Sequence, residues 1–417
     1  MSEVISQEEK EYMKKWIELN SKMSEKGFTW SMLEEDEEFH QYMSFNVLNM
    51  SKDQWGAIQT ATKKIGNIIN KTYKILLKNS ELRKMLNLPK ETLNAITVPS
   101  EYFSYFTRLD LIVNGEDIKV IEINCDTPTG YLETSVANEI ICEDKGLQSP
   151  NQLEYNIFRA WRMIEKDLGI NFDKVYFTSY GEHEEDKQTV LFNMKHSGVN
   201  GEYIAVEDIQ IDEYGIYDTE GNKIEYLYRL YPLEFLPEDV DEHGEKIGEM
   251  FLDHIASGKV KIINPPSAFM MQSKAVMAVV WGFASDNRLD FFTQEELSDI
   301  SKYFLPTYFS KEYFTEDGTP YVEKPIFGRE GGGVKILNEN SNIVEKDEED
   351  WYSEWSKIYQ QYVEMPEMTV DTWAGKYTGK LLIGSFLIGG EPSGVFLRVG
   401  EKITGNLSMF CGVAVNE

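Results

Sequence analysis

Residues 108–124, RLDLIVNGEDIKVIEIN, decide the fold: two runs of alternating apolar and polar residues flank the polar turn NGED. Alternate residues of a β-strand point to the same face, so each run predicts a strand with one apolar face. That face carries Leu109, Leu111, Val113, Ile121 and Ile123. The opposite face carries Arg108, Asp110, Glu122 and Asn124. The stretch predicts a β-hairpin with its polar side chains gathered on one surface.

The apolar face also predicts the register of this hairpin. A slip of one residue turns every side chain of a strand to the other face. Both apolar sets therefore share a face when the connecting loop has an odd number of residues, for example 115–117. Asp110 then lies opposite Glu122, and Arg108 lies opposite Asn124. Directly opposed carboxylates destabilise a sheet unless a positive charge lies between them.

Two interpretations of this polar surface remain open. Carboxylate and amide oxygens are hard ligands that suit a Mg²⁺ ion which keeps water and phosphate oxygens in its other positions. The candidate metal ligands are Asp110, Glu122 and Asn124. The alternative is a solvated polar face on which Arg108 neutralises both acids.

A second segment, residues 321–336, has the pattern strand, glycine loop, strand (YVEKPIFGREGGGVKI). Glycines let the backbone approach a phosphate, and their successive N–H groups form an anion-binding nest. Lys324 and Arg329 are cations that could meet such a phosphate. The segment is not a P-loop, because no GxxxxGK[ST] occurs. An ordinary β-turn is the alternative.

Two more cations are candidates for phosphate contacts. Lys274 interrupts an apolar stretch, 267–283, that predicts one helix, where an unmatched charge is rare. It either reaches the surface along its aliphatic stem or meets a phosphate. Arg398, in FLRVGEKIT, could stabilise charge on a transferring phosphoryl group.

Composition excludes several classes of protein. The formal net charge is −30, which argues against binding to nucleic acid or to an anionic membrane and favours cationic ligands such as polyamines. Solubility is the ordinary role of such acidity. The three cysteines are widely spaced, without a CxxC, and predict neither a disulfide framework nor a zinc site. The N-terminus has no apolar signal segment and no run is long enough to span a membrane, so we expect a cytoplasmic protein.

At 417 residues, the chain is too long for one compact core and predicts two or three lobes. Its mixture of helical and strand patterns predicts an α+β protein. Residues 5–90 have a helical pattern that includes a capping box, Ser51 with Gln54. From about residue 320 the pattern is rich in strands. We divide the chain into a helical region (1–100), an α/β region (101–265) and a third region (266–417), interleaved around one cleft.

Several segments, in order, resemble the glutathionylspermidine synthase family. They are RLDL with VIEINCDTPTG, GEHEED, YRLYPLEF, NPPSAFMMQSKAVMAVVW, VEKPIFGREGGGV, IYQQYV and FLRVGEKITGN. The resemblance covers residues 28–417, loosely over the first seventy or so, and the order and spacing of the segments make it specific. It implies an ATP-grasp-type fold with β-rich lobes around an ATP cleft. In that fold, residues 101–265 would hold substrate and metal, and residues 266–417 would bind the nucleotide.

The resemblance implies a role for each matching residue. Asp110, Glu122 and Asn124 match magnesium ligands. Arg108, Thr127 and Thr129 match positions that hold a peptide, and Glu184 and Glu185 match a carboxylate pair that meets the peptide's amino end and a polyamine. The implied ATP-binding residues are Lys274, Lys324, Arg329, Glu330, Gly331, Gln360, Gln361, Tyr362, Val363, Ile403 and Thr404. The implied catalytic residues are Arg398, which stabilises the transferring phosphoryl group, and Arg108.

The implied activity is that of an ATP- and Mg²⁺-dependent ligase. It would join the carboxylate of a glutathione-like peptide to a polyamine through an acyl phosphate and release ADP. The sequence departs from the family where Phe235, instead of Thr, follows Glu234, and in lacking the cysteine amidase of the bifunctional members, so we expect no hydrolysis of the product. The alternatives are the same chemistry on another acid and amine, and a nucleotide-binding protein that has lost catalysis. A homodimer is compatible with each.

Overall fold

The predicted hairpin lies at one edge of the largest sheet. The computed structural model describes residues 6–35, 38–329, 331–347, 352 and 354–416. Within these residues the large sheet has seven strands in the order β3-β20-β19-β18-β4-β5, with β17 also paired to β18. Its strands are β3 (Met43–Met50), β4 (Phe106–Asn114), β5 (Asp117–Asn124), β17 (Glu367–Thr372), β18 (Gly375–Ile388), β19 (Glu391–Gly400) and β20 (Met409–Val415). Neighbours are antiparallel except β3 and β20, which are parallel.

The hairpin has the predicted pairs but not the predicted loop. Asp110 lies opposite Glu122, and Arg108 opposite Asn124. Asn114 pairs with Asp117, however, so the turn has two residues and not an odd number. A β-bulge between Asp110 and Leu111 supplies the odd residue instead, because Leu111 pairs with Val120 and leaves Ile121 extra.

The bulge also corrects the predicted face of Ile121. Ile123 packs in the main core with Leu109 and Leu111, as predicted. Ile121 packs instead against the separate cluster of Ile112, Met365 and Leu382. The extra residue in β5 therefore turns one apolar side chain toward the other face of the hairpin.

Two smaller sheets accompany the large one. Strands β6 (Val175–Ser179), β7 (Gly201–Ala205), β10 (Tyr226–Arg229) and β11 (Lys261–Ile263) form a parallel sheet in the order β11-β10-β6-β7. An antiparallel sheet has the order β12-β16-β13-β14-β15. Its strands are β12 (Thr307–Tyr308), β13 (Tyr321–Pro325), β14 (Lys335–Leu337), β15 (Ile343–Lys346) and β16 (Lys357–Gln361). Two short ribbons pair β1 (Met32–Glu35) with β2 (Glu38–Gln41) and β8 (Gln210–Asp212) with β9 (Gly215–Tyr217).

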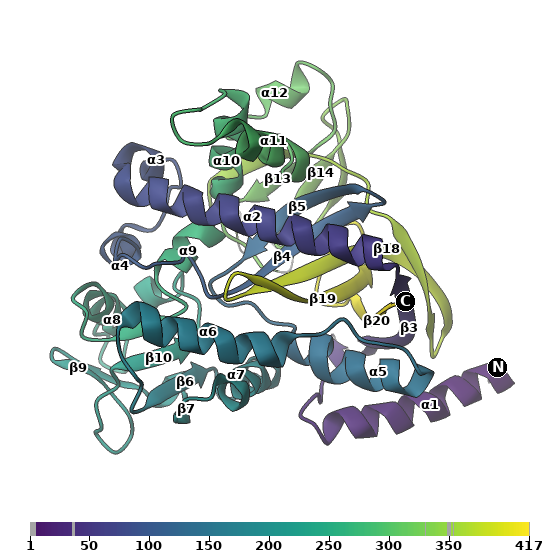
Figure 1. The fold of residues 1–417 in the computed structure, drawn as a ribbon, viewed down its shortest axis with the longest axis horizontal. Helices are drawn as coiled ribbons and strands as arrows, with labels where there is room; N and C mark the ends of the chain where they lie inside the picture. The colour runs from purple at the N-terminus through teal and green to yellow at the C-terminus, as the bar shows by residue number, and fades with distance from the viewer. Residues whose placement is uncertain (1–5, 36–37, 330, 348–351, 353, 417) are drawn as a thin grey trace.

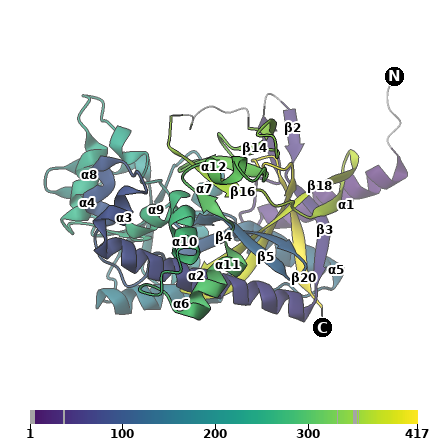
Figure 2. The same ribbon diagram turned by 90° about the horizontal axis from the view of Figure 1, so that it is seen from above.

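Helices surround these sheets, and the longest crosses the large sheet (Figure 1). They are α1 (Gln7–Ser24), α2 (Lys52–Lys78), α3 (Ser80–Lys84), α4 (Leu93–Ile96), α5 (Asn138–Lys145), α6 (Leu153–Leu168), α7 (Glu184–Ser197), α8 (Ile247–Ala256), α9 (Ser267–Gln272), α10 (Ala275–Ser285), α11 (Gln294–Tyr303) and α12 (Glu312–Thr315). Seen from above, α2 and α6 lie along one side of the molecule, and β2, β14 and β16 lie along the other (Figure 2).

Helix α2 forms as its sequence predicts. Ser51 accepts the backbone N–H of Gln54, whose side chain accepts that of Ser51, so the predicted capping box is confirmed. Its buried face carries Ile58, Ala61, Ile65, Ile68 and Ile69. Burial of each such isoleucine stabilises the fold by about 1.5–3 kcal/mol. This face packs the helix onto the large sheet.

The first hundred residues are not helical throughout. Residues 32–35, 38–41 and 43–50 are strands, and β3 joins the large sheet beside β20. The helical interpretation of residues 5–90 is therefore wrong for this segment, which lacks the apolar spacing of the helices on either side. Among the described residues, every helix is too short or too polar to cross a membrane.

Candidate active site

The polar face of the hairpin is neutralised by cations from three separate segments. Asp110 is 1% exposed and accepts hydrogen bonds from Arg108 Nε (2.9 Å to Oδ1) and from Arg398 (3.0 Å to Oδ2). Asn124 Nδ2 also donates to Asp110 Oδ2 (3.3 Å). Glu122 pairs with Lys274 Nζ at 2.8 Å. Arg108 thus neutralises Asp110, whereas Lys274 neutralises Glu122.

These cations keep the half-buried Glu122 ionised. Burial disfavours its charged form, but the ammonium groups of Lys274 and Lys324 and the Arg108 guanidinium outweigh burial and lower its pKa. Glu122 therefore offers a charged oxygen at neutral pH.

Lys274 reaches this face because the predicted apolar helix is broken. Residues 267–283 form two helices, α9 and α10, separated by Ser273 with extended backbone (φ −56°, ψ 125°). Lys274 N–H then donates to Ile326 O (2.8 Å), and its Nζ donates to Gly328 O (2.8 Å). The prediction of one continuous helix is therefore wrong. Lys274 lies at the break between the two helices and is 8% exposed.

Lys324 is a second buried ammonium beside the same carboxylate. Strand β13 carries it, and its Nζ donates to Ile121 O (3.1 Å) and to Gln360 Oε1 (2.8 Å) on β16. Burial and the nearby Lys274 lower the pKa of Lys324 to about 8, with Glu122 acting in the opposite direction. Because burial destabilises the charged form of Lys324, an anion that binds next to it would stabilise the ammonium.

Both lysines line one cavity, named here the lysine cavity. It encloses about 790 Å³, including the space at its open mouth. Apolar side chains from the hairpin and β18, such as Ile112, Ile121 and Leu382, form part of its wall. Most of the residues predicted to bind ATP also lie in this wall: Lys274, Lys324, Gly331, Gln360, Gln361, Tyr362, Val363, Ile403 and Thr404. Glu330 lies outside the described residues.

The glycine loop fits tightly against the segment that follows β19. Gly331 has φ +82°, and a Cβ there would lie 2.6 Å from a side-chain carbon of Ile403. A Cβ on Gly332 would lie 2.9 Å from the ring of Tyr352. These positions require glycine because of the left-handed backbone at the first and the close approach at both.

A second, larger cavity adjoins the first and is named the arginine cavity, after Arg108, Arg329 and Arg398 in its wall. It encloses about 1750 Å³, including its open mouth. It contains the predicted residues Asp110, Asn124, Thr127, Thr129 and Glu185. The two cavities share Glu122, Gly328, Gly331, Arg398 and Thr404. Groups bound in the two cavities would therefore meet at Glu122 and Arg398.

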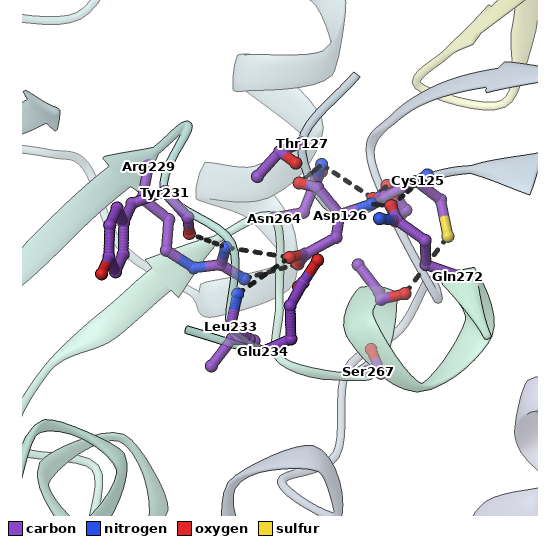
Figure 3. Close-up of polar contacts among 12 residues, drawn as sticks. Cys125, Asp126, Thr127, Arg229, Tyr231, Leu233, Glu234, Asn264, Ser267 and Gln272 are labelled. Carbon is purple, nitrogen blue, oxygen red and sulfur yellow. Dashed lines mark hydrogen bonds and ion pairs between the residues drawn. The ribbon is translucent and has the colours of Figure 1, made fainter. Parts of the chain in front are cut away.

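A buried network holds the turn that carries Thr127 (Figure 3). Arg229 forms two hydrogen bonds to the Asp126 carboxylate, at 2.5 and 3.0 Å. Asn264 donates to the backbone oxygens of Cys125 and Asp126, and Gln272 Oε1 accepts both of their N–H groups. Because both sides of the ion pair are buried and matched, removal of either would leave an unpaired charge.

Two predicted residues lie apart from the groups with which they were expected to act. Arg329, predicted to bind ATP, lies on the arginine cavity, where it contacts Thr127 Oγ1 (3.0 Å) and Glu234 Oε1 (3.3 Å). Glu184 is exposed and accepts a hydrogen bond from Gln188 (3.0 Å), whereas Glu185 and Asp186 line the cavity. Burial, Glu133 and Asp186 raise the pKa of Glu185 to about 8.

Sequence analysis missed several residues on these walls, among them four polar ones. Tyr42 and Glu34 line the arginine cavity, but they belong to the segment predicted to be helical. Lys402 lines the lysine cavity and follows the predicted strand that carries Arg398. Asp186 is adjacent in sequence to the predicted pair and could have been included on that ground.

The donor set suits a magnesium ion that arrives with a phosphate. Asp110, Glu122 and Asn124 carry carboxylate and amide oxygens on the wall of the arginine cavity, and Mg²⁺ is held by one or two carboxylates plus water and phosphate oxygens. In the part of the chain that the structure describes, no group of three or more His, Cys, Asp or Glu residues could hold a metal alone. The residues fit an ion that shares its coordination with a ligand.

Comparison with known proteins defines the class of fold. A glutathione synthetase-like effector from Globodera pallida, solved in its apo form, is similar to this chain with a TM-score of 0.62 at 11% identity, over 99% of both chains. The fold is α+β, of the ATP-grasp type. The profile described as glutathionylspermidine synthase preATP-grasp matches residues 10–416. The chain belongs to the glutathionylspermidine synthase family, so the predicted resemblance is confirmed.

Two curated relatives are named, one as a ligase and one as a synthetase with an amidase activity. A Haemophilus influenzae protein named "Putative acid--amine ligase" is 26% identical over 318 residues, which are 73% of each chain. The bifunctional glutathionylspermidine synthetase/amidase of Escherichia coli is 20% identical over 328 residues, 71% of this chain and 46% of that protein. The match thus spans less than half of the bifunctional relative. Family and relatives support a ligase that joins an acid to an amine.

Proposed function

We propose that this chain is an ATP- and Mg²⁺-dependent ligase that forms an amide from a carboxylic acid and an amine through an acyl phosphate. The observation that carries the proposal is the wall shared by the two cavities, at Glu122, Arg398 and the glycine loop. A nucleotide in one cavity and an acid in the other would meet there, and catalysis needs the reacting atoms held together.

The lysine cavity suits ATP. Its apolar part, bordered by Tyr362 and Val363, offers a surface for the adenine ring. Lys274 and Lys324 lie at its wall as point charges for the phosphates. The glycine loop brings backbone next to the same space.

Asp110, Glu122 and Asn124 would hold the magnesium ion. When bound, it would neutralise negative charge on the phosphates. Arg108 and Arg398 both contact Asp110, and we assign to these guanidinium groups the stabilisation of charge that develops during phosphoryl transfer.

The chemistry proceeds in two steps. An oxygen of the substrate carboxylate attacks the γ-phosphorus of ATP, and ADP leaves. The neutral amine then attacks the carbonyl carbon of the acyl phosphate, phosphate leaves, and the amide nitrogen loses its extra proton. Positioning and charge neutralisation supply the catalysis.

We assign the acid substrate to Arg108, Thr127 and Thr129, and the amine to the acidic wall that carries Glu185. A glutathione-like peptide and a polyamine are the proposed pair. The Arg329 guanidinium lies 5.8 Å from the centre of the Phe235 ring. Because Phe235 departs from the family beside Arg329, which lines the arginine cavity, peptides other than glutathione should be tested as well. We also keep the three-region division of the chain (1–100, 101–265 and 266–417) as a proposal.

An assay of ADP release across a grid of peptides and amines tests this function. We expect release that requires an acid, an amine and Mg²⁺ together. Release that is independent of the amine for every acid would contradict amide formation. Absence of release with every pair would contradict the ligase proposal.

A further inference from the structure

A buried carboxylate behind the arginine cavity has no role in the steps above. Glu133 is 0% exposed and begins a π-helical turn, Glu133–Ala137, a geometry that is frequent at functional sites. Its Oε1 accepts hydrogen bonds from Trp30 Nε1 and from Tyr42 Oη, each at 2.9 Å. Within the described residues its Oε2 is buried without a hydrogen-bond partner. A buried oxygen without a hydrogen-bond partner lowers the stability of the fold, which makes Glu133 a candidate for a functional role.

Tyr42 connects this carboxylate to the cavity. It lies on the cavity wall, in the link between β2 and β3, and is 7% exposed. Burial and the charges of Glu133 and Glu185 raise the pKa of its hydroxyl well above the ordinary value, while Arg398 acts in the opposite direction. The hydroxyl is therefore protonated at neutral pH, and both Glu185 and Arg398 are near enough to influence it.

The direction of the Tyr42 proton decides what the hydroxyl can bind. A phenolic hydroxyl has one proton to donate, and Tyr42 donates it to Glu133. Its oxygen can then offer only lone pairs to a group in the cavity. An ammonium or amine has N–H groups that can donate to this oxygen, so it is the matching partner. A carboxylate or phosphate offers only acceptor oxygens and does not match.

We propose that Tyr42 is a specificity-determining residue that accepts a hydrogen bond from the amine substrate, and that Glu133 is the positioning residue that orients its hydroxyl. This assignment rests on the proposed function and names a part of its amine site. Tyr42 and the neighbouring Glu34 come from the N-terminal segment, whereas Glu185 and Asp186 come from the start of α7. The amine would thus bind between these two segments, facing Arg108 and Arg398.

The decisive variant is Tyr42→Phe, which removes the acceptor oxygen and keeps the ring. We expect the KM for the amine to rise about tenfold or more, since a hydrogen bond to a charged group is lost. The KM values for ATP and for the acid should stay within about twofold. The matched control is Tyr12→Phe, because Tyr12 donates to Asp371 O outside both cavities. It should leave all three KM values unchanged.

Glu133→Gln tests the positioning role. Because Glu133 acts through Tyr42, the double variant with Tyr42→Phe should raise the amine KM no further than Tyr42→Phe alone. An unchanged amine KM in Tyr42→Phe, or equal effects on all three substrates, would overturn the proposal while leaving the ligase function intact.

Calorimetric titration with spermidine separates the two claims. If no acid and amine pair gives ADP release, the ligase function fails, and binding alone decides the role of Tyr42. Affinity for spermidine at least tenfold weaker in Tyr42→Phe than in the unmodified protein would support the acceptor. Equal affinities, or no binding by the unmodified protein, would overturn it.

Discussion

At the scale of single residues, the candidate site depends on charges that are matched inside the protein. Asp110 lies between two guanidinium groups, and Glu122 lies beside two ammonium groups. Each side chain would be destabilising alone, because a buried charge without a partner costs several kcal/mol. Together they form a polar wall in which each carboxylate is paired with cations.

Lys324 predicts a pH dependence of nucleotide binding. Its pKa in the free protein is about 8, and a bound phosphate would raise it. Well below pH 8 the ammonium is already charged, so Lys324 adds no pH dependence to binding; above pH 8 binding must take up a proton, so affinity falls by up to tenfold per pH unit. Calorimetry with ATP between pH 6.5 and 9.5 measures this. Lys324→Met should bind about tenfold to a hundredfold more weakly, with no such pH dependence.

Glu122 predicts a dependence on magnesium. Glu122→Gln keeps the size of the side chain and the hydrogen bond to Lys274, but it removes one anionic ligand. We expect ADP formation to fall at least a hundredfold at limiting Mg²⁺, about 2.7 kcal/mol of lost stabilisation, and to recover partly at high Mg²⁺. Circular dichroism checks the fold. Turnover equal to that of the unmodified protein at limiting Mg²⁺ would show that Glu122 is not a ligand.

At the scale of elements, close packing of α2 on β18 makes two glycines of one helix behave oppositely. A Cβ on Gly66 would lie 2.3 Å from Leu387 Cδ2, whereas nothing lies within 4 Å of a Cβ on Gly56. Gly56→Ala should raise the free energy of unfolding by about 1 kcal/mol through helix propensity. Gly66→Ala should lower it by about 1–3 kcal/mol because the buried Leu387 must move. Chemical denaturation of both variants measures the difference, and equal effects would contradict this packing.

Helix α7 makes a second matched pair. Adjacent helical residues point in different directions, so Glu185 lines the arginine cavity and Glu184 is exposed beside Gln188. Glu185→Gln should raise the KM for a polyamine about tenfold at pH 8, where the carboxylate is substantially ionised, and leave the KM for ATP unchanged. Glu184→Gln should change neither. Equal effects of both substitutions would mean that the amine binds elsewhere.

At the scale of the whole molecule, the net charge of −30 adds a long-range attraction for cations. This attraction is screened over about 8 Å at 0.15 M salt. The KM for an amine substrate should therefore rise with NaCl concentration, and more steeply for spermidine than for putrescine. Steady-state kinetics between 0.05 and 0.5 M NaCl provide the slopes. The same slope for both amines would show that the long-range field plays no part.

Much of the candidate site could be predicted from local sequence patterns. The period of two in residues 108–124 separates the polar from the apolar side chains, and the pairs Asp110 with Glu122 and Arg108 with Asn124 follow from it. Likewise, the capping box at Ser51 depends on residues three positions apart. These features are local, so neighbouring residues alone specify them.

Tertiary packing decided the remaining features. The bulge at Ile121 and the break at Ser273 arise where an element must meet a distant one, and both redirect a side chain into the lysine cavity. The partners of Glu133, which are Trp30 and Tyr42, lie about a hundred residues away. Periodicity specifies which residues share a face of one element, but it carries no information about which other element that face will meet. That choice depends on how the whole chain buries its apolar surface and matches its buried charges.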